Sequence, residues 1–154
     1  MFFTKKNKLI KSLTKLFCEN ANRFNGVYNG VYKILCGENK KNTKVLDEFY
    51  ERVSFVAGYE ELSKVLKKNY PTSQLTPKKL KEFNSIFSKA IENAGISHTY
   101  KDEVIVLTVN NVLHYQEWDD QELYVDTKVK IIFPAWYQND NLIEKGYCTM
   151  INHL

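Results

Sequence analysis

Apolar residues recur every three or four positions through most of the first 95 residues, which is the spacing of one face of a helix. Over Lys5–Arg23 this pattern predicts an amphipathic helix whose other faces carry lysines. A second helical pattern begins at Thr43 and is interrupted by Gly58, and a third stops near Tyr70-Pro71. The chain is therefore predicted to begin with several helices that each bury one face.

The helix with the clearest boundary signals is predicted over residues 77–94. Thr76 is a favourable N-cap, and Pro77 occupies the first helical position, where its missing N–H leaves no bond unmade. Gly95 supplies a C-terminal stop. We expect the apolar face of this helix to lie on the dry side of a sheet. That face consists of Leu80, Phe83, Phe87, Ala90 and Ala94.

A tetrapeptide, Asn-Gly-Val-Tyr, is duplicated in tandem over residues 25–32. A four-residue period places the two valines, and likewise the two tyrosines, along one face of a helix. Each glycine weakens such a helix by about 1 kcal/mol relative to alanine. We expect a helix at this duplication, followed by a polar loop over residues 36–42.

After His98 the apolar pattern changes to the period of two that is typical of strands. Val104–Val109 is apolar on both faces, which predicts a central or covered strand. Further strands are predicted over Val112–Trp118, Leu123–Phe133 and Ile143–Ile151, with polar turns between them. Within the longest of these, apolar and polar residues alternate strictly, as in an antiparallel sheet with one dry face and one wet face.

Helices that precede strands in this way predict an α+β fold, with N-terminal helices packed on a C-terminal antiparallel sheet of three to four strands. A length of 154 residues suits a single domain, with a helical part over about residues 5–95 and a sheet part over about residues 103–152. Aromatic residues make up 14% of the chain, which argues against disorder. The chain contains no apolar run long enough for a membrane span, and lysines interrupt the apolar residues near its start. We expect a cytoplasmic protein.

The net charge of +4 conceals an uneven distribution along the chain. Residues 1–89 contain 18 Lys/Arg and 8 Asp/Glu, whereas residues 90–154 contain 4 and 10. A basic helical half and an acidic sheet half can orient docking to a partner of opposite sign, and the alternative is that the solvated faces differ by chance. Trp and Tyr near predicted turns can supply binding energy at an interface or can simply pack in the core. The candidate partner-binding residues are Lys5, Lys6, Lys8, Lys11, Lys15, Glu117, Trp118, Asp119, Asp120, Glu122, Trp136 and Tyr137.

The sequence carries no signature of a catalytic, cofactor or metal site. The three cysteines are too widely spaced for a zinc pair, and we expect reduced, mostly buried thiols. None of the three histidines has a ligand at metal-binding spacing, and His114 is expected to pack in a strand. The acidic run at residues 117–122 lacks the glycine and the spacing of a calcium loop. We therefore predict a non-enzymatic protein, although a pair of carboxylates can also meet in space without a sequence signature.

Three stretches carry a family resemblance. Leu13–Phe17 is similar to an opening helix, Phe55–Leu62 to a short turn of the Y-G-L-x-D type, and Phe87–Ile91 followed by Val104–Val106 to a passage from helix to strand. In this order they resemble the small baseplate-wedge family of contractile tails, which includes the TssE component of type VI secretion and a wedge subunit of contractile phages. The E-P-R triplet of that family is absent, and Gly95-Ile96-Ser97 stands in its place.

The resemblance implies a non-enzymatic assembly subunit that links sheath to baseplate and binds protein partners within a larger assembly. Two other functions follow from the charge distribution. One is a small inhibitor or immunity protein whose acidic sheet half blocks a basic target. The other is a nucleic-acid-binding protein that uses the N-terminal lysines, which is disfavoured because only two of the 22 basic residues are arginines.

Overall fold

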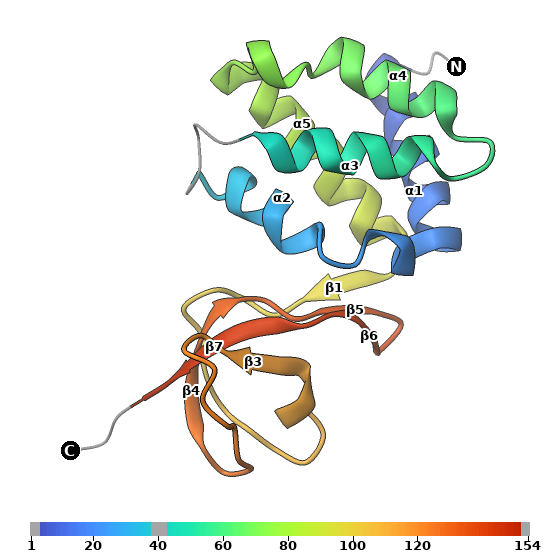
Figure 1. The fold of residues 1–154 in the computed structure, drawn as a ribbon. Helices are drawn as coiled ribbons and strands as arrows, with labels where there is room; N and C mark the ends of the chain where they lie inside the picture. Colours follow the sequence, from blue (N-terminus) through green and yellow to red (C-terminus); the bar gives the residue numbers. More distant parts are fainter. Residues whose placement is uncertain (1–3, 38–42, 152–154) are drawn as a thin grey trace. The chain divides into compact units, whose positions relative to one another are not determined.

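The computed structural model describes residues 4–37 and 43–151 of the chain (Figure 1). The chain forms two compact units, Met1–Gly95 and Ile96–Leu154. Among the described residues, every α-helix belongs to the first unit and every strand to the second. The predicted α+β class is confirmed, and the boundary between the units coincides with the predicted helix stop at Gly95.

The first unit, which we call the helical unit, contains all the helices that the apolar spacing predicted. Thr76 caps α5 as expected, because its hydroxyl oxygen accepts the backbone N–H of Lys79 at 3.2 Å. The positive φ of Gly95, 74°, follows the end of α5. The helices are α1 Lys5–Asn20, α2 Tyr28–Leu35, α3 Lys44–Ser54, α4 Glu60–Asn69 and α5 Pro77–Asn93, with 3-10 turns η1 Ala21–Phe24 and η2 Thr72–Gln74.

The two copies of the duplicated tetrapeptide have different conformations. The first copy forms a turn in which Gly26 has a φ of 91°, so the predicted helix over residues 25–32 begins only at Tyr28. The second copy lies inside α2, where Gly30 lets α3 approach closely. A Cβ atom at Gly30 would lie 2.3 Å from Cγ2 of Val45. Of the predicted loop at 36–42, residues 36–37 form a turn and the rest lie outside the described residues.

Aromatic rings form the centre of the helical unit. The Phe49 ring of α3 lies 5.5 Å from the ring of Phe24, 6.1 Å from that of Phe17 and 5.8 Å from that of Phe87, measured between centroids. Phe83 is 6.5 Å from Phe49 and 5.9 Å from Phe87. The phenylalanines of α5 are buried, but the expectation that its apolar face lies on a sheet is wrong, because these side chains contact rings that α1 and α3 supply.

The second unit, which we call the sheet unit, contains two small sheets rather than one. The four-stranded sheet has the order β2-β4-β7-β3, and the three-stranded sheet has the order β1-β5-β6. Pairing is antiparallel except between β3 and β7, which run parallel. The strands are β1 Ile96–His98, β2 Val104–Val106, β3 Tyr115–Glu117, β4 Lys128–Phe133, β5 Trp136–Gln138, β6 Asn141–Glu144 and β7 Gly146–Met150, with a 3-10 turn η3 at Val112–His114.

Four strand predictions need correction. Of Val112–Trp118, only Tyr115–Glu117 is extended, and Val112–His114 forms the 3-10 turn η3. Val104–Val109 is not a covered strand, because only Val104–Val106 is extended and it lies at the edge of its sheet. The strand expected from Leu123 begins at Lys128, since Asp126 has a φ of 69° and interrupts the extended backbone. The last predicted strand divides into β6 and β7, and the sequence pattern did not predict β1 or β5.

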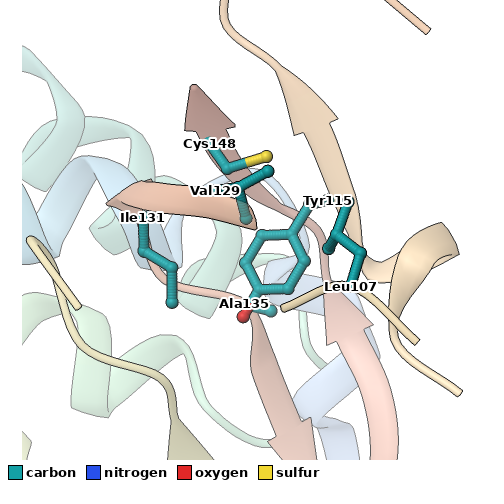
Figure 2. Packing of buried hydrophobic residues seen from close by; sticks show 6 residues of the cluster. All are labelled: Leu107, Tyr115, Val129, Ile131, Ala135 and Cys148. Atoms are coloured by element: carbon teal, nitrogen blue, oxygen red, sulfur yellow. The ribbon is translucent and has the colours of Figure 1, made fainter. Parts of the chain in front are cut away.

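Side chains from both sheets contribute to the core of the sheet unit. The register places Ile131 of β4 opposite Cys148 of β7, so that these two side chains share the inner face of the four-stranded sheet. Tyr137 of β5 and Leu142 of β6 pack against the same cluster. Figure 2 shows the buried members of the cluster, which are Leu107, Tyr115, Val129, Ile131, Ala135 and Cys148.

Candidate protein-binding surface

The face of the four-stranded sheet that points away from this core is its outer face. Cross-strand partners share a face, so the register fixes its members. Val104 is paired with Lys130 and Val106 with Lys128. Lys130 is also paired with Thr149, and Gln116 is paired with Tyr147. The outer face therefore consists of Val104, Val106, Gln116, Lys128, Lys130, Tyr147 and Thr149.

Large apolar side chains are exposed on and beside the outer face. Val104 is 50% exposed and Val106 is 48% exposed. Trp118, directly after β3, is 51% exposed, and its ring lies 5.8 Å from those of Tyr147 and Phe133. Among the described residues, eight of the nine exposed large apolar side chains belong to the sheet unit. Exposed apolar side chains that are neighbours on one strand, as Val104 and Val106 are, are typical of a surface that contacts another macromolecule.

The outer face ends at the open edge of β2. The backbone groups of Glu103 and Leu107 face β4. The carbonyl of Glu103 accepts the N–H of Ile131 at 2.9 Å, and the N–H of Leu107 donates to the carbonyl of Thr127 at 2.9 Å. In an antiparallel pair the intervening alternate residues point their backbone groups the other way. The N–H and C=O groups of Val104 and Val106 are consequently directed to the free edge, where an incoming strand can pair with them.

The predicted acidic loop separates into buried and exposed residues. Glu117 is buried, and its Oε1 accepts the backbone N–H groups of Asp119 at 2.7 Å and of Gln121 at 3.1 Å. This carboxylate holds the turn after β3. The side chains of Asp119, Asp120 and Glu122 are exposed, and they supply the negative charge of the loop.

Replacing Glu117 with alanine should lower the free energy of unfolding of the sheet unit by about 1–3 kcal/mol, because two turn N–H groups lose their shared acceptor. Urea denaturation followed by tryptophan fluorescence measures this change. Glu122→Ala serves as a control, since it alters an exposed residue and should change stability by less than about 0.5 kcal/mol. Equal effects of the two substitutions would contradict the structural role of Glu117.

The aromatic candidates Trp136 and Tyr137 differ in how deeply they are buried. Trp136 is buried, and its ring lies 4.5 Å from that of His98, so it belongs to the interior. Tyr137 is half-buried, and its hydroxyl lies 2.8 Å from Nδ1 of His114, which is in the η3 turn and not in the predicted strand. Burial raises the pKa of Tyr137 to about 12. Burial, together with the nearby charge of Lys145, lowers the pKa of His114, so both partners are neutral near pH 7.

The lysine candidates lie on the helical unit. Lys5, Lys6, Lys8, Lys11 and Lys15 are exposed on α1. Lys5, Lys8 and Lys15 also line one groove beside α4. The predicted basic and acidic residues thus occupy two separate surfaces, one on each compact unit.

No protein-family model matches this chain, and no curated protein and no solved structure is significantly similar to it. Among residues 4–37 and 43–151, no three His, Cys, Asp or Glu side chains are grouped so that they could hold a metal ion. Within the same part of the chain, no helix is long and apolar enough to cross a membrane.

The cysteines differ from the prediction of mostly buried thiols, because Cys18 and Cys36 are exposed. Cys148 is buried in the core of the sheet unit. Burial and the neighbouring charge of Glu117 raise the pKa of the Cys148 thiol to about 11, so it is un-ionised and unreactive near neutral pH.

Sequence reasoning missed Val104 and Val106 as surface residues. Their apolar run predicted burial on both faces, whereas both side chains are about half exposed. Whether a strand lies at the centre or at the edge of a sheet depends on pairing between distant segments. One sequence signal does point to an edge. Asp102-Glu103 immediately precedes the apolar run, and charged residues commonly flank exposed edge strands.

Proposed function

We propose that this chain is a non-enzymatic protein-binding subunit that contacts its partner through the outer face and the β2 edge of the sheet unit. The observation that supports it best is the combination of half-exposed Val104 and Val106 with the free backbone edge of the same strand. An added strand would pair with that edge through backbone hydrogen bonds and would cover the two valines. Trp118 would supply a large aromatic contact at the opposite side of the face.

The exposed acidic loop indicates the charge of the partner. Asp119, Asp120 and Glu122 lie just after Trp118 and are all exposed. Carboxylates at the rim of an interface chiefly raise the association rate with a basic surface. We therefore propose a partner that presents an extended apolar segment next to basic residues.

Substitution of Val106 by aspartate should abolish capture of the partner, because the carboxylate would be desolvated beneath the added strand. The measurement is affinity capture from the native source at low salt, with and without nuclease, followed by mass spectrometry. Val109→Asp is the matched control, because Val109 is 80% exposed in the loop after β2 and lies outside the outer face. If the Val106 variant retains the same stoichiometric protein as the unaltered chain, the proposed surface is wrong.

The identity of the captured protein separates the possible roles. Sheath or baseplate proteins would support an assembly subunit of a contractile injection system. A single toxin or host enzyme would favour an inhibitor or immunity protein, for which Asp119→Asn with Asp120→Asn should slow association and reduce its salt dependence. Material that nuclease removes would favour nucleic-acid binding.

Within the protein-binding class, we propose the baseplate role on the strength of the family resemblance. The stretch Leu13–Phe17 lies in α1, and Gly58, with a φ of 89°, makes the turn between α3 and α4. The stretch Phe87–Ile91 lies in α5, which is followed by strands. This order of elements agrees with the family pattern, and a cytoplasmic location would follow from the same role.

A further inference from the structure

A groove lies between α1 and the segment that begins α4. It has a volume of about 730 Å³, and its floor includes Leu9, Leu62 and Val65. The residues that line it on α1 extend from Lys5 to Glu19. At 1.5 Å per residue this stretch is about 21 Å long, which matches about four turns of a second helix.

One wall of this groove is basic. Lys5, Lys8 and Lys15 line it at intervals of about one or two helical turns, and their side chains are exposed. Within residues 4–37 and 43–151, these three lysines form no ion pair. Glu19 and Glu61 also line the groove, and Glu61 is paired with Lys64 at 3.2 Å. The positive charge of the three lysines exceeds that of the two carboxylates, and beside an apolar floor it favours an occupant that is apolar on one side and anionic on the other.

The groove continues into a second hollow of about 400 Å³ that shares Lys5 and Leu9 with it. Asn69 lines this hollow, and its side-chain Nδ2 is a buried donor without a hydrogen-bond partner in the described part of the chain. Buried donors of this kind normally have an acceptor. Lys6, Lys79 and Glu82 line the same hollow, so a carboxylate there would meet an amide donor and three lysines against one glutamate.

We propose that this groove binds an acidic amphipathic helix of a partner protein. Apolar side chains at positions i, i+3, i+4 and i+7 of that helix would cover Leu9, Leu62 and Val65. Its carboxylates would face the lysines of α1, and a carboxylate at one end would accept a hydrogen bond from Asn69. The length of the α1 wall favours a helix over a small anion, which would occupy only one lysine position.

This docking site is independent of the function proposed for the sheet unit, because every residue that lines the groove belongs to the helical unit. Loss of one binding activity would leave the other intact. The two proposals therefore fail separately, and a Val106→Asp variant should bind a helix in the groove with unchanged affinity.

The direct test uses two fluorescent 15-residue peptides with the same helical spacing of leucines. One carries glutamate at all other positions, and its counterpart carries lysine there. Fluorescence anisotropy at low salt should show that the acidic peptide binds the full chain at least about tenfold more tightly than the basic one. Raising the salt concentration should weaken that binding.

Two pairs of variants locate the binding. Ser12→Trp fills the middle of the groove from an exposed helix position and should abolish binding, whereas Ser85→Trp, exposed on α5, should not. Lys8→Glu with Lys15→Glu should weaken binding by at least about tenfold. Its control is the same charge change at two exposed lysines of α5, Lys81→Glu with Lys89→Glu. Circular dichroism confirms that each variant retains its helices.

Several results would overturn the proposal. They are failure of the acidic peptide to bind at millimolar concentration, binding no tighter than that of the basic peptide, and unchanged binding to the folded Ser12→Trp variant. Binding of the chain to anionic phosphatidylglycerol vesicles tests whether a lipid surface occupies the groove. If the vesicles bind the chain in a way that Ser12→Trp abolishes while the acidic peptide does not bind, a lipid surface occupies the groove instead of a helix.

Discussion

Truncation of Phe49 to alanine should lower the free energy of unfolding of the helical unit by about 3–5 kcal/mol. The ring is fully buried and is surrounded by the rings of Phe17, Phe24, Phe83 and Phe87 at centroid distances of 5.5 to 6.5 Å. Removing it deletes two edge-to-face contacts, one stacked contact and one tilted contact with these four rings, and it leaves a cavity that rings held by three other segments cannot fill. Average stabilities of domains are only about 5–15 kcal/mol, so the variant should be close to unfolding.

The measurement can be confined to the helical unit. Both tryptophans, Trp118 and Trp136, belong to the sheet unit, so helical circular dichroism reports on one unit and tryptophan fluorescence on the other. Phe55→Ala is the matched control, because Phe55 is 73% exposed and its loss should cost less than about 0.5 kcal/mol. A loss below about 1 kcal/mol for Phe49→Ala would mean that the aromatic cluster is not the centre of this unit.

Alanine at Gly146 should destabilise the sheet unit by about 3 kcal/mol, at the upper end of the usual cost of overpacking. A Cβ atom there would lie 2.5 Å from the carbonyl oxygen of Phe133 and 2.7 Å from both the nitrogen of Ala135 and the carbonyl carbon of Pro134. All three are backbone atoms, and they join β4 to β5. Relief of the clash therefore requires movement of the strands themselves, which the tryptophan-detected unfolding midpoint should register.

Gly30→Ala provides an informative comparison. The added Cβ would also meet a neighbour, but that neighbour is the side chain of Val45, which can turn about its own bond. Alanine additionally favours the helix by about 1 kcal/mol. We expect a smaller loss of stability than for Gly146→Ala. The opposite order would show that the backbone around Gly146 moves more readily than the contact between α2 and α3.

Much of the helical unit could be predicted from local signals. Thr76 and Pro77 at the start of α5, and Gly95 at its end, act through bonds to residues within one turn, so their meaning does not depend on the rest of the fold. Apolar spacing identified the buried faces of α1, α3, α4 and α5 for the same reason. The uneven distribution of charge is likewise a property of the sequence alone.

Tertiary structure decided which candidate residues are available to a partner. Glu117 and Trp136 were predicted to bind a partner, yet Glu117 holds a turn and Trp136 packs in the interior. Val104 and Val106 belong to an apolar run that predicts a covered strand, yet β2 lies at the edge of its sheet. The groove combines residues of α1 with residues of α4 that lie more than 40 positions away. Periodicity and capping are local, whereas exposure, strand order and grooves depend on which distant segments pack together, and that selection is made by the folded chain as a whole.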